Sequence, residues 1–144
     1  MIEQDTIRLL RECDAGVKMG VASIDDVMPH IESTELKARL DKCRQEHKKL
    51  EHTIREALDS FGDEGKAPNP IAKGMSKLKT DLKLGLSDRD ATVACLMTDG
   101  CNMGIKSLNK YLNQYTAASE RSKDICKRLI NQEEQLAIDL RSFL

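Results

Sequence analysis

Two residues stand out for the chemistry that their side chains could perform, His47 and Cys101. An imidazole and a thiolate both bind transition metals, and a cysteine beside a histidine can also act as a nucleophile. Gln132, Glu51 and Glu133 could assist them, because amide and carboxylate oxygens supply further hydrogen-bond acceptors and metal donors. Whether these side chains can act together depends on the elements that position them.

Apolar residues recur at intervals of three and four in four long segments, which is the spacing of helices that pack together. The predicted helices span about 3–28, 34–61, 88–115 and 117–143, with a crossover over 62–86, all within a single domain, 1–144. Pro29 is expected to end the first helix, since a proline disfavours helical geometry in the residue before it. Ser33 is placed to cap the second helix at its start, and Gly62 to end it.

A nine-residue phrase near the start, GVKMGVASI at 16–24, returns as GCNMGIKSL at 100–108. A shift of 84 residues relates Gly20 to Gly104, so the first and third helices are two copies of one helix. Short connections make each copy the first half of a helical hairpin. Two repeated hairpins joined by a long crossover predict an all-α, antiparallel four-helix bundle with the topology of ferritin-like proteins.

The crossover contains a short amphipathic segment at residues 71–84, in which an apolar stripe is surrounded by lysines. We expect a short helix there. One interpretation packs it on the bundle with its lysines in solvent, and this is the favoured one. The other makes it a binding site for an acidic partner or a membrane surface.

Counting along the hairpins places the candidate residues at one level of the bundle. Val17 lies fourteen residues before the first turn, and the same distance beyond that turn reaches about His47. Cys101 and Gln132 stand in the same relation to the second turn. The favoured interpretation is a satisfied polar remnant, with His47 hydrogen-bonded to Gln132 or to a water. The alternative is a soft-metal site assisted by the acids named above, although two strong ligands are fewer than a stable zinc site uses.

Four segments carry a resemblance to a known family: DAGVKMG at 14–20, STELKARL at 33–40, TDGCNMGIKSLNKYL at 98–112 and NQEEQLAIDL at 131–140. They resemble an uncharacterised bacterial branch of the ferritin-like four-helix-bundle superfamily, a domain of unknown function. The resemblance implies a di-iron ancestry, with Glu on two helices and Glu-x-x-His on the other two. This chain has no Glu-x-x-His, and where the resemblance implies a metal-binding Glu it has Val17 and Cys101. We therefore expect neither a di-iron centre nor another cofactor.

Composition narrows the remaining possibilities. The formal net charge is −1, which disfavours binding to nucleic acid, and no apolar run is long enough to cross a membrane. The first residues lack the features of a signal peptide, so a cytoplasmic location is expected. The five cysteines are scattered without a C-x-x-C, which argues against a disulfide framework. Asp14 lies on the apolar stripe of the first helix, and we expect it to be buried with Lys18 as its partner.

The favoured hypothesis for function is a non-enzymatic bundle that binds another protein or itself and has lost an ancestral metal site. The alternative is a metal-binding or redox protein that uses His47, Cys101 and the nearby acids. A third hypothesis is binding to an acidic surface through 71–84. Catalysis is less expected, because the sequence has no phosphate-binding loop and no serine nucleophile motif.

Overall fold

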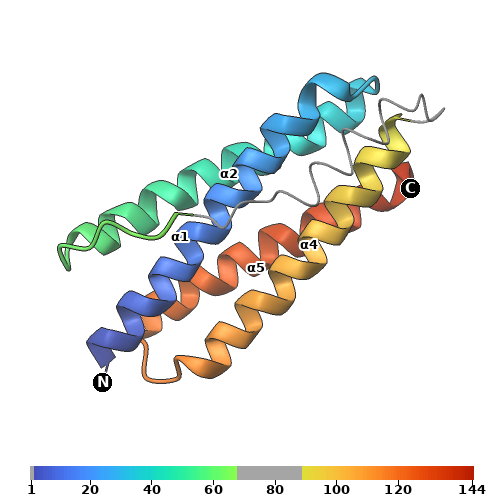
Figure 1. The fold of residues 1–144 in the computed structure, drawn as a ribbon. Helices are drawn as coiled ribbons and strands as arrows, with labels where there is room; N and C mark the ends of the chain where they lie inside the picture. The colour runs from blue at the N-terminus through green and yellow to red at the C-terminus, as the bar shows by residue number, and fades with distance from the viewer. Residues whose placement is uncertain (1, 68–88) are drawn as a thin grey trace.

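The computed structural model describes residues 2–67 and 89–144, and within these ranges it contains four long helices and no strand. They are α1 (Ile2–Val27), α2 (Thr34–Asp59), α4 (Arg89–Gln114) and α5 (Glu120–Leu140), with short 3₁₀ turns η1 (Met28–His30) and η2 (Arg141–Phe143). Figure 1 shows two helix pairs: α1 folds back into α2 through η1, and α4 folds back into α5. The prediction of an all-helical protein is confirmed for this part of the chain. The helix expected over 71–84 lies outside the described residues.

The helix starts follow from serine caps. The side chain of Ser33 accepts a hydrogen bond from the N–H of Leu36 at 3.2 Å, as expected for the N-cap of α2. Ser119 does the same for α5, accepting from the N–H of Ser122 at 3.2 Å. The start expected near residue 117 is therefore wrong: α5 begins at Glu120, because the cap that fixes its first turn lies three residues further along.

The helix ends follow from proline and glycine. α1 stops at Val27, and Pro29 lies in the 3₁₀ turn that follows. Beyond α2, the N–H of Gly62 bonds to the carbonyl of Asp59 and the N–H of Asp63 to that of Leu58. This is the Schellman pattern, and it requires the positive φ of 68° that Gly62 adopts. The chain is thereby turned back across the first helix pair.

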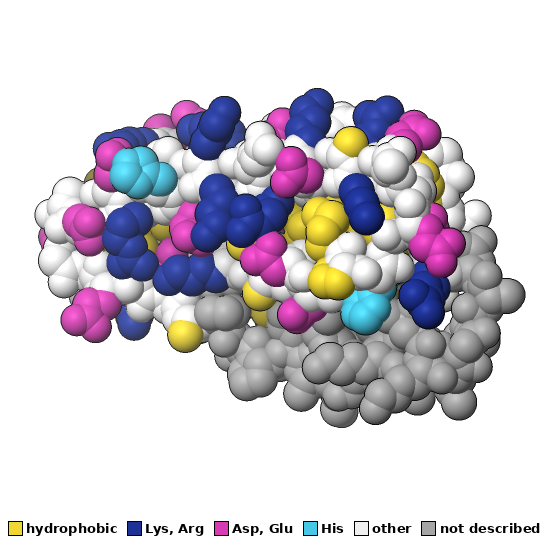
Figure 2. Space-filling model, turned by 90° about the horizontal axis from the view of Figure 1, so that it is seen from above, with side chains coloured by type: hydrophobic (Ala, Val, Ile, Leu, Met, Phe, Trp, Pro, Cys, Tyr) yellow, Lys and Arg dark blue, Asp and Glu magenta, His cyan; other side chains and the backbone are white. Residues whose placement is uncertain are grey.

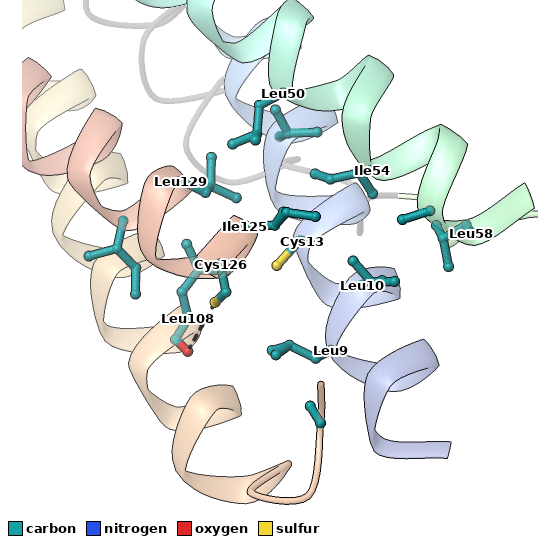
Figure 3. Packing of buried hydrophobic residues seen from close by; sticks show 14 residues of the cluster. Leu9, Leu10, Cys13, Leu50, Ile54, Leu58, Leu108, Ile125, Cys126 and Leu129 are labelled. Atoms are coloured by element: carbon teal, nitrogen blue, oxygen red, sulfur yellow. Dashed lines mark hydrogen bonds between the residues drawn. The ribbon is translucent and has the colours of Figure 1, made fainter. Parts of the chain in front are cut away.

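The buried apolar residues form two clusters at different heights of the molecule. Figure 3 shows part of the first cluster, to which all four long helices contribute. Its members include Leu9, Leu10, Cys13, Val17, Leu50, Ile54, Leu58, Leu108, Ile125, Cys126 and Leu129. The second cluster includes Ile24, Val27, Leu36, Leu40, Cys43, Val93, Met97, Cys101, Leu136 and Leu140. Each fully buried leucine or isoleucine contributes about 1.5–3 kcal/mol relative to exposure, so these clusters are the main source of stability.

The two helix pairs also contact each other through matching polar contacts at their ends. The N–H of the cap residue Ser33 donates to Asp90 Oδ2 at 3.0 Å, in the first turn of α4. The N–H of the cap residue Ser119 donates to Thr6 Oγ1 at 2.8 Å, in the first turns of α1. Residues 6 and 90 are separated by the same 84 positions as the repeated phrase. Each helix pair thus accepts a hydrogen bond from the turn of the other pair, and the two accepting residues are 84 positions apart.

Candidate functional site

A polar level separates the two apolar clusters, and it is formed by His47 of α2 and Glu133 of α5. On α2, His47 lies between Cys43 of the second cluster and Leu50 of the first. The Nε2 atom of His47 is 3.1 Å from Glu133 Oε1. The imidazole is 1% exposed and the Glu133 side chain 13%, so the contact is almost fully removed from water. Because the two residues belong to different helix pairs, their hydrogen bond ties the pairs together.

Both residues of this contact occupy equivalent positions in their helices. His47 stands fourteen residues after the cap Ser33, and Glu133 stands fourteen residues after the cap Ser119. The level therefore joins two residues that stand at the same distance from their helix caps, one a base and the other an acid. A protonated histidine and a glutamate carboxylate can form a charge-assisted hydrogen bond.

Gly20 makes room for the imidazole of this pair. A Cβ atom at Gly20 would lie 2.7 Å from His47 Cδ2 and 2.8 Å from Nε2, so the imidazole lies directly against the backbone of α1. At its counterpart Gly104, a Cβ atom would lie 3.7 Å from Glu133 Cδ. A glycine inside a helix costs about 1 kcal/mol relative to alanine. The close approach of the imidazole therefore explains the glycine at position 20, whereas the contact at Gly104 is an ordinary one that does not require glycine.

Two thiols complete the site, which we call the central polar cluster: Cys43, His47, Cys101 and Glu133. The sulfur of Cys43 is 3.7 Å from His47 Nδ1, on the opposite side of the ring from Glu133. Cys101, from α4, is 2% exposed, and Glu133 and Cys43 are among the neighbours that raise the pKa of its thiol. The cluster thus receives one imidazole, one carboxylate and two sulfur atoms from three helices.

The surroundings set the protonation of these groups. Burial lowers the pKa of His47, but hydrogen bonds to Cys43 and Glu133 outweigh it and raise the pKa to about 10. The imidazole is therefore protonated at neutral pH. Burial, together with the neighbouring charge of Glu133, raises the pKa of Cys101 well above its ordinary value. Cys101 is consequently a thiol, which is a weak nucleophile and a poor metal ligand.

The other candidates from the sequence lie outside this cluster. The expected hydrogen bond from His47 to Gln132 is wrong, because the adjacent residue Glu133 points at the imidazole. Gln132 Oε1 is buried and has no hydrogen-bond partner within residues 2–67 and 89–144. Glu51 lies one turn along α2, where its carboxylate is 3.9 Å from Lys48 Nζ. Val17, expected at this level, is instead part of the first apolar cluster.

Sequence reasoning missed Cys43 and the role of Gly20. A signal for Cys43 was present, since residues four apart on a helix lie on one face and Cys43 precedes His47 by four. The role of Gly20 depends on how closely α1 approaches α2, which no local pattern reveals.

The donor set can be compared with the di-iron centre that the family resemblance implies. Such a centre uses four glutamates and two histidines, whereas the central polar cluster offers one carboxylate and one imidazole. In the part of the chain that the structure describes, no group of three or more His, Cys, Asp or Glu side chains is placed to hold a metal ion. These donors do not fit a di-iron centre.

A second buried polar site lies on α1, around Asp14. Its side chain is 0% exposed, and Oδ2 is 2.7 Å from Lys18 Nζ, so the expected partner of Asp14 is confirmed. The same oxygen accepts the backbone N–H of Lys66 at 3.1 Å and lies 3.7 Å from Arg55 Nη2. Positive groups thus surround this acid on one side, and it holds the segment after α2 against the first helix pair.

Comparisons with known proteins give a fold but no function. Among the helices that the structure describes, none combines the length and apolar character that crossing a membrane requires. No family model and no curated protein matches the chain. The crystal structure of a DUF305 fragment from Deinococcus radiodurans is similar over 96% of this chain and 93% of that one, with a TM-score of 0.75 and 7% identity. At that identity the similarity shows the fold alone: the chain shares its helical fold with a domain of unknown function, and membership of the ferritin-like superfamily stays a prediction.

Proposed function

We propose that the protein is a non-enzymatic bundle of ferritin-like topology, built from two repeated antiparallel hairpins, that binds another protein or a second copy of itself. In this proposal the His47–Glu133 pair occupies the level where relatives would hold metal. The observation that carries the proposal is the buried 3.1 Å contact between these two residues, which stand at the same distance from their helix caps. A protonated histidine and a carboxylate satisfy each other there without an ion.

The equivalent contacts at the two ends support the repeated-hairpin topology. Asp90 and Thr6 stand at corresponding positions and each accept the N–H of a cap serine from the other helix pair. Two unrelated hairpins would have no reason to use the same position for the same purpose. The glycines of the repeated phrase add a second correspondence at the centre of the molecule.

The burial of the central polar cluster supports a role without catalysis. A reacting group must touch its substrate, and His47 and Cys101 are almost completely enclosed by the helices. Cys101 is held as a thiol and His47 as an imidazolium, so neither is ready to act as a nucleophile or a base. Together they form a satisfied polar network inside an apolar core, which favours one arrangement of the helices over others.

The surface suits contacts with proteins better than contacts with nucleic acid. Figure 2 shows basic and acidic side chains interspersed on one face, with a small apolar area between them. Nucleic-acid binding needs a continuous positive field, which this mixture does not supply. Large apolar side chains are exposed on both helices of the second pair, with Met103 of α4 at 68% and Ile138 of α5 at 47%. Met103 and Ile138 are therefore the residues at which we expect a protein partner to make contact.

Light scattering over a range of concentrations tests self-association, with Met103→Gln and Ile138→Gln as surface variants. A dimer that the variants weaken supports binding to a second copy. A strict monomer refutes self-association and leaves a different protein as the partner, to be sought by affinity capture with the same variants as controls.

The second candidate function is a metal-binding or redox protein, and the observation that favours it is the pair of thiols beside His47 and Glu133. Soft metals prefer thiolate and imidazole ligands. Metal binding would require the Cys101 thiol to lose its proton, so metal uptake would release a proton to the solvent. Thermal unfolding with added Zn²⁺ and with a chelator separates the candidates: a stabilisation that His47→Ala removes supports the metal site, and an unchanged midpoint supports the first function.

The third hypothesis, an acidic-surface site at 71–84, lies outside the described residues. Flotation with anionic vesicles at low salt tests it, and the absence of any bound protein would eliminate it.

A further inference from the structure

A small cavity lies at the end of the molecule where α2 stops and α5 begins. Its volume is about 100 Å³, and its walls come from α1, from the end of α2 with the turn that follows, and from the start of α5. The residues that line it are Thr6, Leu10, Ala57, Ser60, Phe61, Ser119, Arg121, Ser122 and Ile125. No acidic side chain is among these described residues, so the wall carries no negative charge.

Thr6 leaves one hydrogen-bond donor without an acceptor on the cavity wall. Its side chain is 3% exposed, and its Oγ1 accepts the N–H of Ser119 at 2.8 Å. A hydroxyl group also donates one hydrogen bond, but no atom in the described part of the chain accepts the one from Thr6. The Ser122 hydroxyl differs, because it donates to the carbonyl of Ser119 at 2.7 Å. An acceptor inside the cavity would therefore satisfy a buried donor that the protein itself leaves unpaired.

Arg121 supplies a positive charge at the exposed side of the cavity. It lies in the first turn of α5, and its guanidinium forms no ion pair or hydrogen bond with the described residues. The same turn carries the positive end of the helix dipole. The acid in that turn, Glu120, has a side chain that is 85% exposed and lies 3.7 Å from Lys123 Nζ. The cavity is thus electropositive and has a guanidinium free to bind an anion.

Apolar side chains form the rest of the wall. Leu10 of α1 and Ile125 of α5 belong to the first apolar cluster (Figure 3), and Ala57 joins them from α2. Phe61 is 39% exposed and borders the cavity near the surface. Such a wall suits a hydrocarbon group better than an inorganic ion, which needs polar partners on all sides. The volume is several times what one water requires and accommodates about five non-hydrogen atoms.

We propose that this cavity binds a short aliphatic carboxylate of the size of propionate. One carboxylate oxygen accepts the free hydroxyl hydrogen of Thr6, the guanidinium of Arg121 donates to the same group, and the hydrocarbon chain contacts the apolar wall. A carboxylate combines a planar anionic head that matches a guanidinium with an apolar tail. The site is independent of the central polar cluster and of the protein partner.

Two-dimensional ¹H–¹⁵N NMR of the full chain tests the proposal, with sodium propionate as the probe and sodium chloride at equal ionic strength as the reference. We expect saturable shifts at the backbone amides of the lining residues, including Thr6, Ser119 and Ser122. The dissociation constant should be on the order of 1 mM, as suits a ligand of about five non-hydrogen atoms. Propionamide, which has the same shape without the charge, should bind at least about tenfold more weakly.

Variants at the two polar residues assign the contacts. Arg121→Gln should weaken propionate binding at least about tenfold, because charge-assisted hydrogen bonds are lost. Arg128→Gln is the matched control: it removes an exposed arginine further along α5 that does not line the cavity, and the affinity should stay unchanged. Thr6→Ser keeps the hydroxyl and should keep binding, whereas Thr6→Val should weaken it.

Several results would overturn the proposal. Shifts that grow without saturation, or that saturate at residues away from the cavity, would remove the site. Equal affinities of the Arg121→Gln and Arg128→Gln variants would remove the role of the guanidinium. Tighter binding of propionamide or of inorganic phosphate than of propionate would exclude a carboxylate as the ligand. Because Arg121 is exposed, its variant decides the question even if Thr6→Val fails to fold.

Discussion

Gly20 and Gly104 occupy the same position in the two similar nine-residue segments, 16–24 and 100–108, yet adding a methyl group should have opposite effects at the two. At Gly104 the new Cβ would meet Glu133 at 3.7 Å, an ordinary contact. At Gly20 it would lie 2.7 Å from the ring of His47. The imidazole cannot withdraw freely, because Cys43 and Glu133 hold it from two sides.

The magnitudes follow from three effects. Replacing glycine by alanine inside a helix stabilises it by about 1 kcal/mol, and Gly104→Ala should keep most of this gain. At Gly20 the gain is opposed by overpacking, which costs about 1–3 kcal/mol. Displacing the ring from Glu133 leaves buried polar groups imperfectly paired, at a further cost of about 1–3 kcal/mol. We therefore expect Gly20→Ala to destabilise the protein by about 3 kcal/mol.

Urea unfolding of the two variants and the parent protein measures the difference directly. The midpoint should fall for Gly20→Ala and rise for Gly104→Ala, with little change in the slope of the free energy against urea concentration. In a His47→Ala background the obstruction is removed, so Gly20→Ala should change sign and become stabilising. Equal effects at the two glycines, or the same destabilisation in both backgrounds, would refute the assignment of Gly20 as the residue that admits the imidazole.

Three further predictions concern individual residues. Gly100→Ala should stabilise the protein by about 1 kcal/mol in thermal unfolding, because a Cβ there meets nothing within 4 Å; a loss of stability would show an unrecognised contact. Asp14→Ala should destabilise it by about 3 kcal/mol in urea unfolding, since Lys18 and the segment after α2 lose a buried acid, and a neutral result would contradict that role. The pKa of His47 is raised to about 10, so the stability it contributes is complete below its unfolded pKa of about 6.5 and is lost as pH rises through 10. The unfolding free energy should therefore fall between pH 7 and 10, and His47→Gln should flatten this decline.

Features set by local chemistry could be predicted from the sequence. The cap at Ser33, the glycine turn at Gly62 and the pairing of Asp14 with Lys18 each depend on residues within five positions of one another. The all-helical class followed from the spacing of apolar residues, which is also a local pattern.

Features set by the register between distant helices could not be predicted as well. Adjacent residues on a helix point about 100° apart, so a small error in the start of α5 exchanges Gln132 for Glu133. The connection after α4 spans residues 115–119, whereas the expected helices left only residue 116 between them, and this difference shifted the counting at the second turn.

The central claim is that a protonated histidine and a glutamate replace a metal centre at the middle of the bundle. Elemental analysis of untagged protein, purified without chelator and compared with His47→Ala, tests it most directly. We predict much less than one iron, zinc or copper ion per chain in both proteins. A stoichiometric ion in the parent protein that disappears in His47→Ala would contradict the claim and establish the central polar cluster as a metal site.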